Sequence, residues 1–576
     1  MRGHFLLTYA GVVLALACVS GFYSGSAAAQ TMGYGGLGGE DAVGPGAASG
    51  NGTSGNGSSG GGQGEKATVG RRVEIRPYIE LDQIVSAQLS PGSDVLTYTQ
   101  AAVGVDAGLQ GRRTGLSLSA RYARQIGWGD GRNSDVLSGV ARGYATVTPG
   151  LTLEAGGLAT QSSFSGGSAR YLGGDDRRTV YSVYAGPTLA TRAGAVDLQG
   201  SYRAGYSSVE QGNAFLPAPD GERVTRSEDS LVQSVELQAG VKPGTVLPVG
   251  LAVAGSAYQE DISVLDQRVR DMQARAMVTL PVSRTVQVVG AIGYEDVEIS
   301  NRDVSTDAED RPLIGRDGQY VTDTSSPRQL SYDVSGILWD VAVMWRPSRR
   351  TSFSAHVGRR YGSTTFGGQL AYSPDDRKTL SVSVYDNLAG FGGQINRALN
   401  DLPTDFEAVR DPVTGDLVGC VNSLEGGNCL PGVLGSLRAS AFRARGIAAS
   451  YTMQIGRLSA GIGLGYDRRK YIAAQGTILA SANGMVDENT WASLYLSGPL
   501  GRNAGWSTNG YVNWITSTDT TFGDVTTYGL AASYYHMITP RLRGTLAVSV
   551  DGSSYDLDTV RDYWSLTGLA GLRYNF

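Results

Sequence analysis

The sequence is poor in lysine, histidine and cysteine. Of its 576 residues only three are His and three are Cys, and Lys occurs only at positions 66, 242, 378 and 470. The 48 Lys and Arg residues are nearly balanced by 53 Asp and Glu residues, which leaves a formal net charge of -5. This balance excludes the strongly basic surface of a nucleic-acid-binding protein, so we expect no nucleic-acid partner.

Long hydrophobic runs are also missing from most of the chain. From Val73 to the C-terminus, no apolar run approaches the roughly 20 residues that a membrane-spanning helix requires. One apolar run near the N-terminus, Phe5 to Val19, follows Arg2 and precedes three small residues, Ala27 to Ala29. This arrangement is typical of a secretory signal peptide, which we predict over residues 1–29. Lipidation of Cys18 stays open as an alternative.

Glycine, by contrast, is abundant. It supplies 82 of the 576 residues, about twice its usual share of roughly 7%. Many of these glycines lie in a polar tract before Val73, which cannot bury enough apolar area to offset the entropy lost on ordering. The sequence therefore predicts a signal peptide over residues 1–29, a flexible linker over 30–72 and a folded body over 73–576.

The folded body alternates apolar and polar residues with the period of two that indicates β-strands. In the last predicted strand one face carries Trp564, Leu566, Gly568, Ala570, Leu572, Tyr574 and Phe576, and the other carries Ser565, Thr567, Leu569, Gly571, Arg573 and Asn575. Strands of soluble sandwiches are usually only about five or six residues long. Longer strands rich in Gly and Tyr are typical of transmembrane β-barrels.

The links between these strands alternate in length. Short, turn-like links lie at 110–113, 148–150, 192–194, 242–244, 281–283, 347–349, 373–375, 455–457, 498–500 and 539–541. Mostly longer, more polar links lie at 129–133, 162–177, 208–229, 261–271, 300–328, 387–437, 474–489 and 517–524. An outer-membrane barrel has short turns in the periplasm and long loops outside. The sequence therefore predicts an all-β fold, a transmembrane antiparallel up-and-down β-barrel of about 22 strands. A tight link at 360–363, where a long loop is due, leaves 20 to 24 strands as the range.

Alternation also separates side chains that face lipid from those that face the lumen. A lipid-facing Arg or Lys costs about 2 to 4 kcal/mol at the membrane midplane, so charged residues within strands are expected to face inward. The predicted lumen-facing residues are Arg76, Glu80, Asp106, Arg121, Arg142, Glu154, Arg203, Glu236, Arg275, Glu295, Asp340, Arg543 and Arg573. Both signs are present, which argues against a strongly anion-selective or cation-selective ring. We expect most of these Arg residues to form structural ion pairs.

Catalytic and metal-binding patterns are weak. After removal of the signal peptide the only histidines are His356 and His536. His356 shares a strand face with Ser354 but has no third, orienting group, and His536 falls on the lipid face near a periplasmic end. No spacing of metal ligands and no phosphate-binding glycine loop occurs. We therefore expect no enzyme activity, no cofactor and no metal.

The longest link is the candidate for a functional loop. Cys420 and Cys429 lie within it, and in an exported, oxidising setting these two thiols predict a disulfide; a free pair is the alternative. The apolar residues of this loop are Ile395, Leu399, Leu402, Phe406 and Val409. We therefore hypothesise that Phe391 to Leu434 folds inward and constricts the lumen.

The C-terminus resembles the assembly signal of Gram-negative outer-membrane β-barrel proteins. That family ends in an aromatic residue preceded by apolar residues at every second position, as Leu572, Tyr574 and Phe576 do here. The resemblance implies an outer-membrane location in a Gram-negative bacterium, contact with outer-membrane lipid, and recognition of the last strand by the barrel-assembly machinery. It covers the chain from Val73 onward.

A narrower resemblance concerns the stretches at 73–80, 180–187 and 358–365. They are similar to exported barrels that carry the label preprotein translocase subunit YajC. A genuine YajC is a short inner-membrane protein with one membrane helix, so the sequence does not support that label. The hairpin sequence from Arg360 to Thr365 is also similar to barrels encoded with exopolysaccharide export systems. This similarity implies a role in polymer secretion, with an export system as partner.

Two classes of function remain. The first is a porin-like channel or conduit for small solutes or exported polysaccharide, because a barrel of about 22 strands is wide enough to hold a lumen. The second is a non-conducting outer-membrane anchor or assembly partner of an export system, with a filled lumen. A TonB-dependent transporter carries a folded plug before its barrel, which the Gly-rich tract from Gln30 to Arg72 does not resemble. The permeant and the oligomeric state are not indicated by the sequence.

Overall fold

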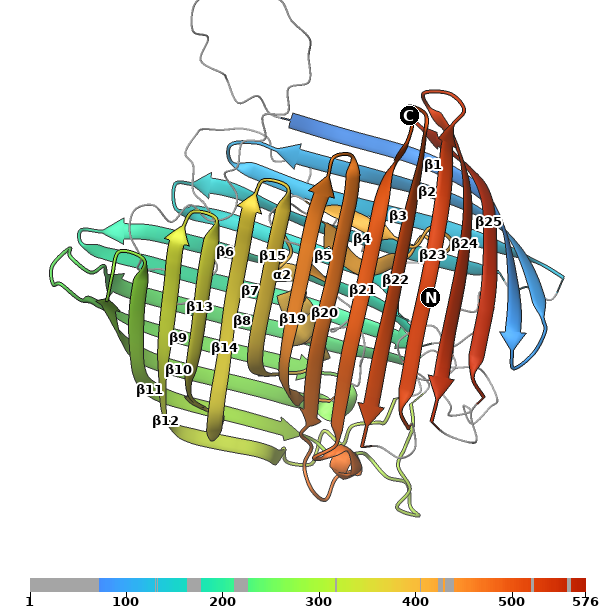
Figure 1. The fold of residues 1–576 in the computed structure, drawn as a ribbon. Helices are drawn as coiled ribbons and strands as arrows, with labels where there is room; N and C mark the ends of the chain where they lie inside the picture. Colours follow the sequence, from blue (N-terminus) through green and yellow to red (C-terminus); the bar gives the residue numbers. More distant parts are fainter. Residues whose placement is uncertain are drawn as a thin grey trace, which may run out of the picture.

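The protein is a closed β-barrel. The computed structural model describes residues 72–129, 131, 133–162, 178–211, 226–315, 319–404, 406–422, 428–429, 440–518, 523–556 and 561–576. Within them, 22 antiparallel strands form one sheet, and the pairing of β1 with β25 closes it (Figure 1). The predicted transmembrane up-and-down barrel of about 22 strands is confirmed. The predicted signal peptide and nearly all of the predicted linker lie outside the described residues.

The barrel strands follow one another in chain order around the wall. They are β1 (Arg72–Ser90), β2 (Val95–Gln110), β3 (Thr114–Trp128), β4 (Ser134–Thr148), β5 (Leu151–Ser162), β6 (Arg178–Ala193), β7 (Val196–Gln211), β8 (Arg226–Val241), β9 (Gly250–Ile262), β10 (Gln267–Pro281), β11 (Val286–Asn301), β12 (Gln329–Ser348), β13 (Thr351–Arg360), β14 (Ser363–Asp375), β15 (Lys378–Ala389), β19 (Phe442–Ile455), β20 (Leu458–Tyr471), β21 (Val486–Leu500), β22 (Ala504–Ser517), β23 (Val525–Met537), β24 (Leu542–Tyr555) and β25 (Tyr563–Asn575). Most are longer than the roughly 9–11 residues that cross a bilayer, so their ends extend beyond the hydrocarbon layer.

The two ends of the barrel differ as predicted. Each of the ten short links joins consecutive strands at the same end, which we call the turn end, and the other links meet at the loop end. One prediction is wrong: residues 261–271 form no long loop, because β9 and β10 pair up to Ile262 and Gln267 and only the short 3-10 helix η1 (Val264–Asp266) joins them. A second 3-10 helix, η2 (Ile478–Ala482), lies between β20 and β21.

The tight hairpin between β13 and β14 is real. Tyr361 and Gly362 form its turn with φ values of 55° and 65°, the left-handed conformation that two-residue hairpin turns of the type I′ class require. Arg360 pairs with Ser363 directly before and after the turn. A two-residue turn therefore stands where a long loop was due, and the strand count stays at 22.

The wall has an apolar outer face and a polar inner face. On β25 the outward residues Trp564, Leu566 and Leu572 are exposed, whereas Ser565 and Thr567 point inward and are buried. The other strands alternate in the same way, with large aliphatic and aromatic side chains outside. This is the reverse of a soluble protein and is the pattern of a barrel surrounded by lipid.

The link between β15 and β19 enters the barrel. It forms helix α2 (Phe391–Asn400) and a three-stranded sheet of β16 (Glu407–Arg410), β17 (Leu417–Asn422) and β18 (Asn428–Cys429). Figure 1 shows α2 inside the ring of strands. We call the described residues 390–404, 406–422 and 428–429 the inner segment. Among the described residues, no helix has the length and apolar character needed to cross a membrane.

Candidate functional site

The inner segment is anchored at its start by a buried carboxylate. Glu260, on the inner face of β9, is fully buried. It accepts hydrogen bonds from the backbone N–H groups of Gly390 (2.6 Å) and Gly393 (3.1 Å), at the N-terminus of α2. The hydroxyls of Ser230 (2.7 Å) and Tyr258 (2.5 Å) also donate to it. A carboxylate here satisfies free N–H groups of the first helical turn and is favoured by the helix dipole.

Glycine is required in the first turn of α2 because the helix touches the wall there. A Cβ atom at Gly392 would collide with the Ser230 side chain, and one at Gly393 would collide with the Tyr258 hydroxyl and with Glu260. These two positions therefore allow the close approach that the Glu260 contact needs.

The side of α2 that faces the barrel wall is apolar and packs against an apolar patch of that wall. Phe391, Ile395 and Leu399 are spaced four residues apart, so they share one side of the helix. All three are buried, as is Leu402, and they pack against wall residues of β4 to β9 that include Val180, Tyr184, Val209 and Ile262. Phe406 packs partly buried against the same cluster, and the side chain of Val409 lies outside the described residues. The hypothesis that this loop folds inward is supported by these contacts.

The far end of the inner segment is held by polar contacts. The Arg410 guanidinium donates to the hydroxyls of Ser119 (2.9 Å, β3) and Ser138 (2.7 Å, β4). The Arg410 carbonyl accepts a hydrogen bond from the Asn509 amide of β22 at 3.4 Å. Arg121 donates to the carbonyl of Thr414 at 3.3 Å. Because β3 and β22 lie on opposite sides of the β1–β25 seam, the inner segment bridges part of the lumen.

The two cysteines lie in the small sheet of the inner segment. β17 and β18 pair antiparallel with Cys420 directly opposite Cys429 in the backbone register. Their side chains lie outside the described residues, so the disulfide stays a prediction.

The sequence-predicted lumenal residues all lie on the inward-pointing face of their strands. Glu295, Asp340, Arg121 and Glu154 are buried, and Arg76 and Glu236 are exposed. The ion pairs among the charged side chains of the wall include Arg76–Glu74, Arg121–Glu80 (2.9 Å), Arg573–Glu80 (3.4 Å), Arg573–Asp106 (3.3 Å), Arg142–Glu154 (3.9 Å), Arg203–Glu154 (2.9 Å), Arg275–Asp340 (3.5 Å) and Arg360–Glu295 (3.4 Å). Arg543 lies over the ring of Tyr535.

These pairs run along the wall. Arg203 on β7 reaches Glu154 on β5, and Arg275 on β10 reaches Asp340 on β12, each over one intervening strand. Because opposite charges are compensated locally, the described residues form no ring of one sign around the lumen.

Glu260 and Arg410, the residues that hold the inner segment, are not among the site residues predicted from the sequence. The alternation of β9 places Glu260 on the inward face, so the strand pattern could have added it to the lumenal set. No local signal identifies its partner, because the first turn of α2 lies far away in the chain.

The carboxyl of Asp401, in the inner segment, has a shifted pKa. Asp401 follows α2 and remains accessible to lumenal water, but the surrounding barrel desolvates its carboxyl and raises its pKa to about 6. Arg142 and Arg397 oppose this shift, and Glu236 adds to it. Asp401 therefore changes charge in a mildly acidic medium.

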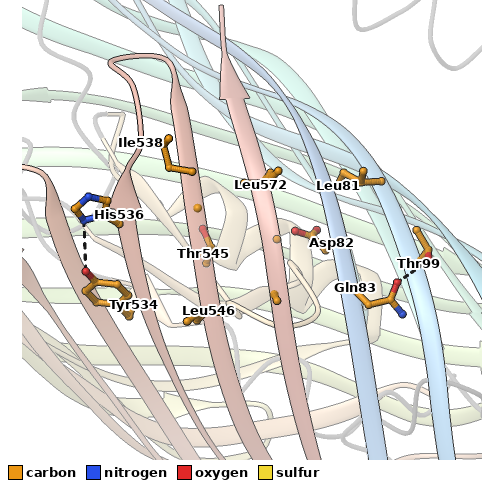
Figure 2. A pocket seen from close by; sticks show the side chains of 13 residues that line it. Leu81, Asp82, Gln83, Thr99, Tyr534, His536, Ile538, Thr545, Leu546 and Leu572 are labelled. Atoms are coloured by element: carbon orange, nitrogen blue, oxygen red, sulfur yellow. Dashed lines mark hydrogen bonds between the residues drawn. The ribbon is translucent and has the colours of Figure 1, made fainter.

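The two histidines lie on opposite faces of the barrel wall. His356 lies on the inward face of β13 with Ser354. His536 lies on the outer face, in a shallow groove of about 530 Å³ at the seam of the barrel, 3.5 Å from the Tyr534 hydroxyl (Figure 2). The exposed residues that line this groove, such as Leu81 and Leu572, face lipid. In the part of the chain that the structure describes, no group of three or more His, Cys, Asp or Glu could hold a metal ion.

A closed 22-strand barrel with an apolar exterior and a charged, polar interior defines an outer-membrane β-barrel protein of a Gram-negative bacterium. No protein-family model and no curated protein matches the sequence.

Solved structures with a similar shape include two transporters and one import receptor. The copper transporter OprC aligns with a TM-score of 0.38 and 11% identity over 87% of this chain and 81% of its own. The FrpB iron transporter from Neisseria meningitidis (F5-1 variant) aligns with a TM-score of 0.42 and 9% identity, over 87% of this chain and 82% of its own. The ferric-catecholate import receptor Fiu from E. coli K12 aligns with a TM-score of 0.40 and 10% identity, over 86% of this chain and 81% of its own. At these scores, the likeness adds nothing to the fold described above.

Proposed function

We propose that this protein is an outer-membrane channel whose lumen is constricted by its own inner segment. The observation that carries this proposal is the docking of α2 and β16 on the inner wall, through Glu260 at one end and Arg410 at the other. A segment that served only as an external loop would not need a carboxylate buried in the wall to hold it.

The permeant is a small solute or an exported polysaccharide. If it is a polysaccharide, the partner is an export system. The polysaccharide alternative is supported by the similarity of the Arg360 to Thr365 hairpin to barrels of exopolysaccharide export. Recognition of Leu572, Tyr574 and Phe576 by the barrel-assembly machinery belongs to the same proposal. The outward direction of all three side chains makes them accessible before the barrel closes.

Planar-bilayer conductance of the refolded protein tests the channel. Three forms are compared: the wild type, a variant lacking residues 391–434, and the pair Ser207→Cys with Asn396→Cys. The hydroxyl of Ser207 accepts a hydrogen bond from the Asn396 amide at 3.0 Å, so the two cysteines can lock α2 to β7. The wild type treated with the same reductant controls for the natural cysteines.

We expect small, stable current steps from the wild type, larger steps from the deletion variant, and steps no larger than those of the wild type from the oxidised pair. Equal conductance of the deletion variant and the wild type would contradict the constriction. No current from any form, with folding shown by heat-modifiable mobility, would contradict the channel and favour the anchor or assembly partner.

A further inference from the structure

The inner wall of the barrel has two chemically different parts. The strands β1 to β12, together with β24 and β25, direct the predicted charges inward, and Asp82, Glu260 and Asp271 add to them. From β13 to β23, the inward positions between the strand ends are mostly Ser, Thr, Asn, Gln, Gly, Ala and aromatic residues, with His356 on β13. The charged exceptions are Asp467 and Arg469 on β20 and Asp487 on β21, which are all buried near the loop end, where Arg469 pairs with Asp467 at 2.5 Å. Away from these three buried side chains, no inward position between the strand ends is Asp, Glu, Lys or Arg. We call this second part the uncharged wall.

The uncharged wall is continuous because its residues are in register from strand to strand. One row pairs Ser352 with Ala371, then Ser381 with Ser450, then Gly463 with Ser493. Several of its side chains are open to the lumen: Ser352, Ser354, Ser381, Ser383 and Ser450 are half-buried, and Gln369 is exposed. At these open positions the wall therefore offers hydroxyl and amide groups without charged side chains.

Aromatic rings lie flat on this wall. Tyr495 is opposite Gly461 in the register, Tyr511 is opposite Gly529, and Tyr535 is opposite Gly505. A Cβ atom at each of these glycines would collide with the tyrosine ring, so each ring covers the bare backbone of its neighbour. Such a ring turns one face to the wall. All three tyrosines are partly exposed. Arg543 lies over the Tyr535 ring, 5.2 Å from its centroid, so Tyr495 and Tyr511 are the rings that can offer their other face to the lumen.

The combination of flat aromatic faces and uncharged hydrogen-bonding groups selects a class of ligand. A charged solute gains little from this wall, because the charged side chains between its strand ends are buried and desolvation of the solute is costly. A neutral, polyhydroxylated chain can place its apolar ring faces on the tyrosines and its hydroxyls on Ser, Gln and Asn side chains, as in sites that combine aromatic and oriented polar groups.

The inner segment leaves much of this wall to the lumen. Its helix packs mainly on β5 to β8, and Arg410 binds β3 and β4. It reaches the uncharged wall at Asn509 through the Arg410 carbonyl. A chain that follows the tyrosines therefore passes beside the inner segment.

We propose that the uncharged wall binds neutral carbohydrate chains, with Tyr495 and Tyr511 as stacking surfaces. This inference rests on the proposed channel and names its ligand class. It makes the permeant an uncharged oligosaccharide or polysaccharide.

Equilibrium binding to the full-length mature protein in detergent tests the wall without requiring conductance. Isothermal titration calorimetry with maltoheptaose, a neutral linear glucan, is compared with a titration of an anionic oligogalacturonate of similar length. We expect maltoheptaose to bind and the anionic chain to bind at least tenfold more weakly. The double variant Tyr495→Leu/Tyr511→Leu should lose about tenfold in maltoheptaose affinity, since each stacked ring contributes modestly.

The matched control is Tyr528→Leu. Its ring also covers a glycine of the next strand, Gly552, but on the outer face of the barrel. Its loss disturbs the same kind of packing and should leave affinity unchanged. Single variants Tyr495→Phe and Tyr511→Phe keep the ring and should bind within about twofold of the wild type, which separates stacking from a folding defect.

The outcomes separate this inference from the proposed channel. No binding of maltoheptaose to the wild type, or equal loss in the Tyr528 control, overturns the carbohydrate wall. Conductance without maltoheptaose binding supports the proposed channel and contradicts neutral carbohydrate as its ligand class. Maltoheptaose binding with no conductance in any form supports the wall and contradicts the channel.

Discussion

At the scale of single residues, the inner segment contains a group that responds to pH. The pKa of Asp401 is raised to about 6 in the docked segment by desolvation, whereas a carboxyl in water titrates near 3.9. The docked state therefore binds the proton more tightly than a released segment does. By linkage, docking becomes more favourable as pH falls from about 6 to about 4, and this gain is absent at neutral pH.

We predict that the channel conducts less at pH 5.0 than at pH 7.5 because the inner segment is then held more firmly. Single-channel recordings at both pH values measure this difference. Asp401→Asn should conduct equally at both, since the substitution removes the carboxyl that takes up the proton. A pH response of the same size in Asp401→Asn would assign it to another group.

At the scale of elements, α2 is held at its N-terminus by one side chain of another strand. Glu260 accepts four hydrogen bonds, two from the helix and two from wall hydroxyls. A hydrogen bond to a charged group contributes roughly 1.5–3 kcal/mol. Loss of this carboxylate leaves the first turn of α2 with unpaired N–H groups close to the wall.

We predict that Glu260→Ala releases α2 and raises the single-channel conductance toward that of the variant lacking residues 391–434. Limited proteolysis of the folded barrel should cut the inner segment faster than in the wild type. Asp340→Ala removes an inward carboxylate from β12 whose ion-pair partner, Arg275, lies on the wall, and it serves as the control, with unchanged proteolysis of the inner segment. Equal proteolysis of Glu260→Ala and the wild type would show that the apolar packing of Phe391, Ile395 and Leu399 is sufficient.

At the scale of the whole molecule, closure depends on the first and last strands. β1 and β25 pair from Tyr78–Asn575 to Ser90–Trp564, with one irregularity near Gln88. The terminal Phe576 is exposed on the outer face, and its ring packs edge-on against Tyr574 at 5.2 Å. It adds little to the packing of the finished barrel, which agrees with a role before closure.

We predict that Phe576→Ser lowers the amount of folded barrel in the outer membrane of cells several-fold, while refolding in detergent stays close to wild type. Heat-modifiable mobility on gels measures the folded fraction in both settings. Trp564→Ser, at the other end of β25 on the same face, should have the smaller effect in cells. A refolding defect as large as the defect in cells would indicate a structural role for Phe576 instead of recognition.

The strands and their order follow from local patterns in the sequence. In every strand, residues alternate between the lipid-facing and the lumen-facing side, because the two surroundings favour opposite polarity. On β25 this alternation places Trp564 outside and Ser565 inside. Turn residues such as Pro149 and Gly150 then mark where each strand ends. The even count of 22 follows once the tight turn at Tyr361 and Gly362 is read as a hairpin.

The arrangement inside the barrel was decided only by the tertiary structure. The apolar residues Ile395 and Leu399 indicated that the long loop would be buried, but not that Glu260 would hold its helix or that Arg410 would reach Ser119 and Ser138. These contacts join residues more than a hundred positions apart, and their partners are set by the curvature and closure of the sheet. The same closure places the tyrosines of β21 to β23 along one wall. Local periodicity thus specifies the barrel and its two faces, whereas the contents of the lumen depend on distances across it.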